Sequence, residues 1–445
     1  MQKKYIKVRG IVKGYPFEFI KNAVIEITDS TITGIYEAGK EPLKDNEYID
    51  FGNYIATPGF IQTHIHLCQT LFRGLADDLE LLDWLNKRIF PLECAHSESS
   101  MRASAALGIS ELFRSGTTAI MDMGSINHEH TIIEEVEKSG LRAFLGKAMM
   151  DINDSCPKFK ESTKDSIESS RELAKIIVDK NNPLLNYAFA PRFILSCSDE
   201  LLYSAYELHK EFKNSLYHTH ASENKGEMEA VFKRTGKRNI EAFNEMGLLS
   251  DRSCFAHCIW LNDEEINMMK ESSSRVLHCP SSNLKLGSGI ANIPGYLERG
   301  INVSIAADGA PCNNNLSVLT EMRHAALIQK IKSPVLMPAL TVFQMATIDG
   351  AKALHIESQT GSLEKGKHAD IVFWNFDNTG NSLLLENLES IVSNIVYSAS
   401  ANDIDSVMIG GKFVIKNREN LIFDDEKIIS DGKSELIKTI ERAGI

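Results

Sequence analysis

Residues 58–66 read PGFIQTHIH, an apolar strand that follows a Pro-Gly turn and ends in His64 and His66. Residues two apart on a strand point to the same face, so the two imidazoles converge on one point. Neutral imidazole nitrogens at the end of a barrel strand suit a divalent metal ion. A lone pair of this kind is as often a surface feature, so the prediction depends on matching residues later in the chain.

The same stretch marks a change of texture in the sequence. From Gly59 on, short apolar segments alternate with stretches whose apolar residues recur every three to four positions. The apolar segments are residues 116–124, 141–151, 185–193, 214–222, 253–261, 274–280 and 301–309. Strands that alternate with helices predict βα units and a parallel sheet. Seven to eight units over some 300 residues favour a closed (β/α)8 barrel, or TIM barrel, over an open sheet.

Both ends of the chain read as short strands and turns. Residues 5–57 alternate apolar and polar positions, and this texture returns near Leu363, with Gly410-Gly411 as a hairpin signal. We therefore expect an α/β protein with three parts. These are a small composite β-sandwich domain from residues 1–58 and 360–425, a barrel over residues 59–359, and a C-terminal helix over residues 426–445.

Composition excludes several classes of protein. The 445 residues are 43% hydrophobic and 24% charged, as in ordinary globular proteins, and the formal net charge of −12 argues against a nucleic-acid surface. The N-terminus lacks the apolar core of a signal peptide, and no apolar run approaches the roughly 18–20 residues of a membrane span. Eight cysteines without CxxC spacing suit thiols in a reducing compartment. We expect a cytoplasmic protein without a nucleic-acid or membrane partner.

Three later strands also end in residues that bind metals or carry protons. The run at 217–223, YHTHASE, places His220 and Glu223 three apart, with His218 as a competitor for the ligand role. The strand at 253–257 ends in His257, and the one at 303–308 ends in Asp308. A carboxylate after an apolar strand is costly to bury unless it is paired or binds a cation, although it could instead cap the next helix.

These motifs, in this order, resemble the amidohydrolase superfamily, in the branch of aminopurine deaminases and triazine hydrolases. The resemblance covers nearly the whole chain, including the late GSLEKGKHAD at 361–370. It implies one divalent ion, Zn²⁺ by default with Fe²⁺ as the alternative. The implied metal ligands are His64, His66, His220 and Asp308. The implied catalytic residues are Glu223, His257 and Asp308.

The implied chemistry is hydrolytic deamination. An ion held by three imidazoles and a carboxylate lowers the pKa of a bound water from ~16 toward ~7. Glu223 would contact the substrate and pass a proton to a ring nitrogen, while His257 and Asp308 would relay protons as ammonia leaves. This branch lacks the carboxylated lysine of its two-metal relatives, so we expect Lys147 to stay outside the metal site.

Two substrate classes remain open within the resemblance. Trp84 and Glu93 resemble the segment that closes over a nucleoside in methylthioadenosine/S-adenosylhomocysteine deaminases, where the glutamate would grip ribose hydroxyls. Gln69, Arg192 and Phe193 instead resemble guanine deaminases, where Gln and Arg would read the base edge and Phe would stack on its face.

The run at 72–78 and the Asn-rich loop at 313–315 favour the nucleoside group. We therefore expect a deaminase of 5′-deoxyadenosine, methylthioadenosine, S-adenosylhomocysteine or adenosine that yields an inosine-type product and ammonia. The alternatives are a guanine deaminase, or an s-triazine (melamine-type) aminohydrolase or chlorohydrolase. A barrel that only binds ligands is disfavoured because every expected ligand and proton carrier is present. By resemblance, a homo-oligomer is expected.

Overall fold

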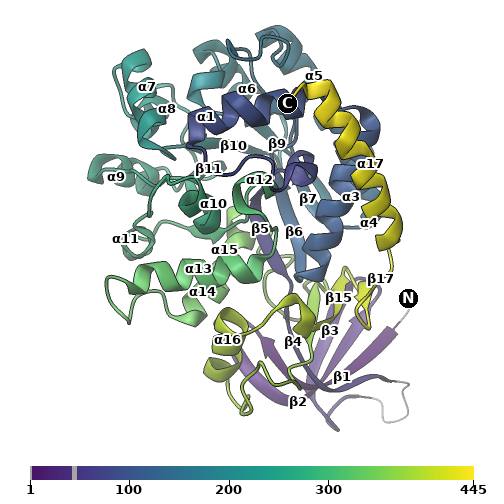
Figure 1. The fold of residues 1–445 in the computed structure, drawn as a ribbon. Coiled ribbons are helices and arrows are strands. Elements are labelled where there is room, and N and C mark those ends of the chain that lie inside the picture. The colour runs from purple at the N-terminus through teal and green to yellow at the C-terminus, as the bar shows by residue number, and fades with distance from the viewer. Residues whose placement is uncertain (1–2, 43–47) are drawn as a thin grey trace. The chain divides into compact units, whose positions relative to one another are not determined.

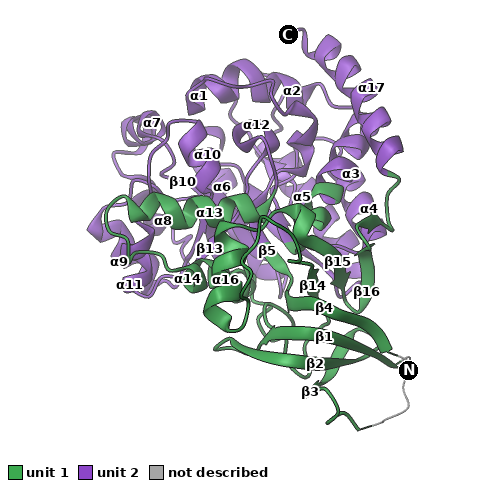
Figure 2. Cartoon of the chain, turned by 60° about the horizontal axis from the view of Figure 1, so that its bottom comes forward, with its two compact units in different colours: residues 1–61, 110–119, 317–424 green, residues 62–109, 120–316, 425–445 purple. Residues whose placement is uncertain are grey.

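The computed structural model describes residues 3–42 and 48–445, which form two compact units (Figures 1 and 2). One unit comprises residues 1–61, 110–119 and 317–424, and the other comprises residues 62–109, 120–316 and 425–445. Residues 43–47, which fall within the predicted N-terminal strands, lie outside the described chain. In the part of the chain that is described, no helix combines the length and apolarity that crossing a membrane requires.

The first unit contains a mixed sheet of eight strands, in the order β17-β16-β15-β14-β4-β1-β2-β3. Its strands are β1 (Lys3–Lys13), β2 (Glu18–Thr28), β3 (Thr31–Glu37), β4 (Tyr48–Pro58), β14 (Ile371–Trp374), β15 (Ile404–Ile409), β16 (Lys412–Lys416) and β17 (Glu419–Asn420). The antiparallel pairing of β14 with β4 joins the two ends of the chain in one sheet. Apolar side chains from β1, β2, β14 and β15 share its buried core.

The second sheet is the barrel, with strand order β13-β12-β11-β10-β9-β7-β6-β5 and the short β8 paired with β9. Its strands are β5 (Phe60–Ile65), β6 (Thr117–Asp122), β7 (Arg142–Leu145), β8 (Ala148–Met149), β9 (Leu185–Pro191), β10 (Leu216–Ala221), β11 (Ser253–His257), β12 (Arg275–His278) and β13 (Val303–Ile305). A parallel bridge between Ile65 and Asp308 connects the first strand to the last. The predicted (β/α)8 barrel, with a separate β-region built from both chain ends, is confirmed.

Helices follow the barrel strands in sequence, as the 3–4 residue spacing predicts (Figure 1). They are α3 (Glu98–Arg114), α4 (Glu129–Ser139), α5 (Thr163–Asp179), α6 (Asp199–Glu211), α7 (Lys225–Thr235), α8 (Asn239–Glu245), α9 (Asp263–Glu271), α10 (Pro280–Lys285), α11 (Ile293–Glu298), α12 (Ala310–Asn313), α13 (Val318–Lys330), α14 (Ala339–Met345) and α15 (Ile348–Ala353). Later in the chain come α16 (Leu388–Tyr397) and α17 (Asp425–Ala443).

The connection between β5 and α3 is made of short helical turns. These are the 3-10 helix η1 (Leu67–Phe72), α1 (Leu81–Trp84), the π-helix η2 (Leu85–Ile89) and α2 (Phe90–Cys94). A π-helix is rare and is found mostly near functional sites. Apolar side chains of α1, η2 and Phe90 form one buried cluster with residues at the ends of β8 and β9, and those of Leu71, Phe72 and Leu92 form a second cluster. The connection is therefore packed against the carboxyl end of the barrel.

Gly124 offers a test of how tightly the loop after β6 is packed there. Its φ is +66°, and a Cβ at this position would lie 2.1 Å from the carbonyl oxygen of Gly146. Gly140, at the end of α4, has a φ of +72°, and a Cβ added there would have no other atom within 4 Å. Both Gly→Ala changes carry the left-handed penalty of roughly 1–2 kcal/mol. We expect Gly124→Ala to lower the unfolding free energy by about 1–3 kcal/mol more than Gly140→Ala in urea titrations, and equal losses would contradict this packing.

Candidate active site

Four side chains from three widely separated parts of the chain meet at the carboxyl end of the barrel. His64 lies near the end of β5 and His66 directly follows that strand. His220 is the next-to-last residue of β10, and Asp308 follows β13. One ligand atom from each lies within 4.8 Å of those of the other three. The Nε2 atoms of His64 and His66 each lie 3.3 Å from Oδ1 of Asp308. The four predicted ligands are thus brought together.

Hydrogen bonds behind the imidazoles fix which nitrogen faces the cluster. Nδ1 of His220 donates to the carbonyl oxygen of Arg192 at 2.7 Å. Nδ1 of His64 is joined to Nε2 of His218 at 2.7 Å, which places His218 behind His64 and outside the ligand group. Burial lowers the pKa of each of the three cluster imidazoles. Each ring therefore favours its neutral form, in which one nitrogen has a lone pair that can bind a metal ion. Outer partners of this kind orient metal-binding histidines.

Asp308 carries the negative charge of the cluster. Burial alone would raise the pKa of this carboxyl, but its hydrogen bond to His64 and the surrounding imidazoles hold it well below the usual range. Ser282 Oγ donates to Oδ2 at 2.7 Å, and the N–H of Gly309 donates to Oδ1 at 2.8 Å. The backbone φ of Asp308 is +65°, a left-handed conformation that costs roughly 1–3 kcal/mol for a residue other than glycine. The surrounding structure holds the carboxylate in place against this strain.

Glu223 and His257 lie beside the cluster and face each other. Nε2 of His257 is 3.4 Å from Oε2 of Glu223 and 3.9 Å from Oδ2 of Asp308. Nδ1 of His257 donates to Oδ1 of Asn283 at 2.8 Å, which directs Nε2 toward the two carboxyls. Burial, with Asp308 and Glu227 adding to it, raises the pKa of Glu223 well above its usual value. The site therefore contains one group that favours its protonated form and one oriented imidazole.

A small, partly open cavity borders these groups. Its volume is about 30 Å³, which is room for roughly one water. Its apolar wall consists of Leu81, Trp84 and Leu85, from α1 and η2. Its polar wall contains Gln69 and Arg192. The lining residues are His66, Gln69, Leu81, Trp84, Leu85, Arg192, Phe193, His220, Glu223, Glu227, His257, Leu286 and Asp308. Five residues were predicted to bind substrate without any other role, and four of them line the cavity: Gln69, Trp84, Arg192 and Phe193. The fifth, Glu93, lies behind Gln69 and Arg192.

The donor set fits a divalent metal ion. It combines three neutral imidazoles with one carboxylate, which is chemistry typical of Zn²⁺ sites in proteins. Nε2 of His257 is buried and has no hydrogen-bond partner among the described residues, as expected for a group that faces a ligand. Lys147 is buried elsewhere, in an ion pair with Glu161, and does not join the group.

Comparison with known proteins agrees with this geometry. The model of the amidohydrolase family matches residues 55–414. The chain belongs to the amidohydrolase family. A 5′-deoxyadenosine deaminase of Methanocaldococcus jannaschii is 38% identical, over 92% of this chain and 94% of that protein. A 5-methylthioadenosine/S-adenosylhomocysteine deaminase of Syntrophomonas wolfei is 34% identical, over 95% of both chains.

Solved structures share the fold of this amidohydrolase. A crystal structure of an adenosine deaminase from Xanthomonas campestris with bound zinc superposes with a TM-score of 0.91 and 25% identity, covering 98% of each chain. A guanine deaminase from C. acetobutylicum with bound guanine gives a TM-score of 0.84 at 27% identity, covering 93% of this chain and all of that one.

A buried ion pair holds Arg192 in the polar wall of the cavity. Arg192 donates from Nη1 and Nη2 to the two carboxylate oxygens of Glu93, at 2.8 and 3.0 Å. Gln69 Nε2 donates to Oε1 of Glu93 at 2.6 Å. The Arg192 side chain is 3% exposed and that of Glu93 is fully buried. Glu93, predicted to grip ribose hydroxyls, is therefore engaged by two protein partners, while Gln69 and Arg192 line the cavity.

Sequence reasoning missed several residues of the site. Ser282 and Asn283 lie on α10, where Ser282 donates a hydrogen bond to Asp308 and Asn283 accepts one from His257. Glu227 accepts the N–H of Glu223 at 2.7 Å and belongs to the capping box of α7. The capping pattern Asn-x-x-Glu at 224–227 was a usable signal for Glu227. Nothing in the sequence pointed to Leu81, Leu85 or Leu286 as cavity walls.

We expect the buried Arg192–Glu93 pair to contribute to the stability of the fold. Glu93→Gln leaves the guanidinium buried without its counter-charge, so we expect the unfolding free energy to fall by about 3–5 kcal/mol. The exposed pair Lys87–Asp83, 2.8 Å apart, is the control, and Asp83→Asn should cost about 0–1 kcal/mol. Urea unfolding midpoints measure both variants, and similar losses would show that the buried pair is not structural.

Proposed function

We propose that this chain is a metal-dependent hydrolytic deaminase that removes the exocyclic amine of an adenosine-type nucleoside. The candidate substrates are 5′-deoxyadenosine, methylthioadenosine, S-adenosylhomocysteine and adenosine, and the products are the inosine-type nucleoside and ammonia. The observation that carries the proposal is that three members of the His/Asp cluster border the same cavity as Glu223 and His257, and that the other walls of this cavity suit a planar base. The names of the two relatives support the substrate class.

The residues proposed to hold the ion are His64, His66, His220 and Asp308. Zn²⁺ is the ion that this donor set favours, with Fe²⁺ as the alternative. When bound, a divalent ion lowers the pKa of a water ligand toward ~7 and so supplies a nucleophile at neutral pH.

Glu223 and His257 are proposed to manage the protons of the reaction. The buried Glu223 carboxyl can hold a proton and give it to the ring nitrogen beside the amine-bearing carbon, which makes that carbon more electrophilic. His257 can exchange a proton at Nε2 with the reacting centre, because Asn283 fixes its other nitrogen. Asp308, 3.9 Å from that Nε2, can take the proton of the hydroxyl group added to the substrate and pass it toward the amine, which must gain a proton to leave as ammonia.

The cavity walls are proposed to read the base. Trp84 and Phe193 supply flat apolar faces, and Gln69 and Arg192 supply polar groups for the base edge. The Trp84 Nε1 atom is buried without a hydrogen-bond partner in the described chain, so its N–H is available to a ligand. Glu93 would contact a sugar only by sharing its oxygens with Arg192, because a carboxylate accepts about four hydrogen bonds.

That engagement of Glu93 favours the second candidate, a guanine or aminotriazine substrate. A free base needs no acceptor for sugar hydroxyls, and Arg192 with Gln69 could read its polar edge directly. The two candidates differ in what Glu93 does: it binds substrate in the first and only positions Arg192 in the second.

The metal and proton roles separate in mutants. We expect Asp308→Asn and His220→Ala to abolish turnover and to lower bound metal, because each removes a ligand. Glu223→Gln should keep the metal and lose about 10²-fold or more in kcat, since it removes only a proton carrier. His209→Asn, at a buried histidine held by Ser215 outside the cluster, is the control and should retain both properties. Full activity in any of the first three variants would remove the assigned role.

The substrate class is tested with a panel of five compounds. Ultraviolet difference spectra and ammonia release should show turnover of adenosine, 5′-deoxyadenosine or methylthioadenosine, and none of guanine or melamine. Glu93→Gln should then lower kcat/KM for nucleosides more than for adenine, a ratio that does not depend on protein stability. Turnover of guanine or melamine alone, or equal losses for nucleoside and base, would favour the second candidate.

A further inference from the structure

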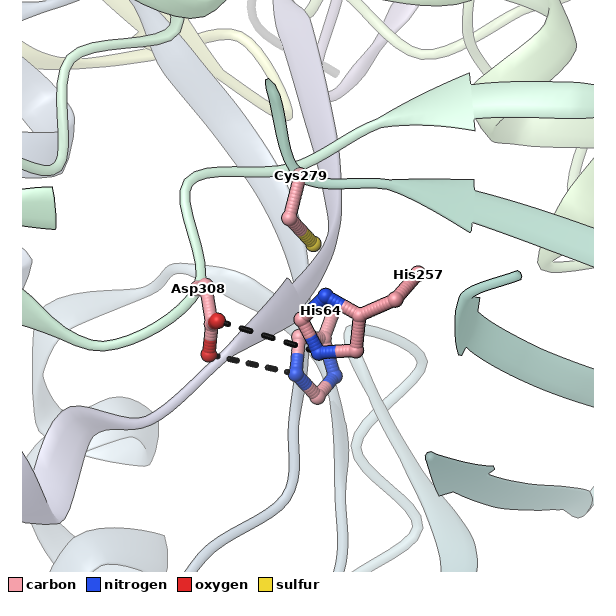
Figure 3. A group of neighbouring side chains, drawn as sticks. All are labelled: His64, His257, Cys279 and Asp308. Atoms are coloured by element: carbon pink, nitrogen blue, oxygen red, sulfur yellow. Dashed lines mark ion pairs between the residues drawn. The ribbon is translucent and has the colours of Figure 1, made fainter. Parts of the chain in front are cut away.

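A buried thiol lies next to the His/Asp cluster. Cys279 follows β12 and precedes α10, so it stands at the same end of the barrel as His257 on β11 and Asp308 after β13. Its Sγ and one ligand atom each from His64, His257 and Asp308 all lie within 4.8 Å of one another. All four side chains are buried. Figure 3 shows the thiol, the two imidazoles and the carboxylate directed toward a common space.

This group overlaps the proposed ligand set without matching it. Both groups contain His64 and Asp308, and they differ in whether His66 and His220 or His257 and Cys279 complete them. One set offers only nitrogen and oxygen, whereas the other offers a sulfur. Thiolates favour soft ions, while harder ions such as Mn²⁺ favour oxygen ligands over sulfur. The two positions therefore differ in the ions that they prefer.

We propose that His64, His257, Cys279 and Asp308 form a second, overlapping cation position that takes thiophilic divalent ions and holds the enzyme inactive. The inference rests on the proposed function, because it assumes that the cluster binds a divalent ion and that His257 carries a proton. Binding replaces the thiol proton with a metal–sulfur bond, and the proton leaves to solvent without any change of oxidation state.

The inhibitory effect follows from the geometry of His257. Its Nδ1 is already committed to Asn283, so Nε2 is the single nitrogen left for either a cation or a proton. Nε2 is also the atom that faces Glu223 and Asp308. An ion bound at Cys279 would occupy this nitrogen and end proton exchange at the reacting centre. The choice between the two positions would make activity depend on which ion is bound.

The test uses Cd²⁺ as the soft probe and Mn²⁺ as the hard one. The metal-depleted full-length chain receives one equivalent of either ion, and bound metal is measured by equilibrium dialysis. We expect a thiolate-to-cadmium charge-transfer band in the ultraviolet for the Cd²⁺ form and none for the Mn²⁺ form. Cys279→Ser should lose the band. It should also bind Cd²⁺ at least ~10-fold more weakly, because loss of a residue that only hydrogen bonds to a metal ligand already costs that much affinity.

Cys197→Ser is the matched control. Cys197 is also buried, and its thiol donates to the carbonyl of Met149 away from both groups. This variant should keep the band and the affinity. If Mn²⁺ binds but Cd²⁺ gives no band in the unmodified chain, or if the band survives in Cys279→Ser, the second position is wrong while the proposed function stands. If neither ion binds the unmodified chain, both proposals fail. If Cys279→Ser does not fold, the comparison of Cd²⁺ and Mn²⁺ in the unmodified chain still tests the second position.

Discussion

The hydrogen bond from the Asp308 N–H to the carbonyl of His64, 3.0 Å long, joins the last barrel strand to the first. The same two residues then bring their side chains together, with Nε2 of His64 3.3 Å from Oδ1 of Asp308. The two residues that close the barrel thus also belong to the site. A buried carboxylate is tolerated only if it is compensated, and here Ser282 and the Gly309 N–H join the imidazoles in doing so. Loss of that compensation would therefore disturb the seam of the barrel as well as its chemistry.

The parts of the site that follow from strand geometry could be predicted from sequence. Period-two spacing places His64 and His66 on one face, and the carboxyl ends of parallel strands meet at one mouth, which brings His220 and Asp308 to them. The competition with His218 could not be decided by spacing, because both residues face the same way on β10. The structure separates them by depth, since His218 hydrogen bonds to the far nitrogen of His64.

The rest depended on loop paths, which carry no periodicity. Glu93 and Arg192 are 99 positions apart and lie on segments whose approach no local pattern encodes. The resemblance assigned Glu93 to a sugar and Arg192 to a base as alternatives, whereas the structure pairs them in one network with Gln69. Ser282 and Cys279 were equally hidden, because their importance comes from which strand ends they face. Strand-end positions are local properties of the sequence, and side-chain partnerships are not.

The cavity is too small for a substrate, so part of its wall must move when a substrate binds. A volume of about 30 Å³ is far below the roughly 300 Å³ or more of sites that enclose small organic ligands. Separating Arg192 from Glu93 would strand two buried charges. Moving Leu81, Trp84 and Leu85 outward only exposes apolar surface, and a bound base would cover that surface again. These three residues lie on α1 and at the start of the π-helix, whose hydrogen bonding is already irregular. Outward movement of the apolar wall would therefore cost less free energy than movement of the polar wall, which the buried ion pair holds in place.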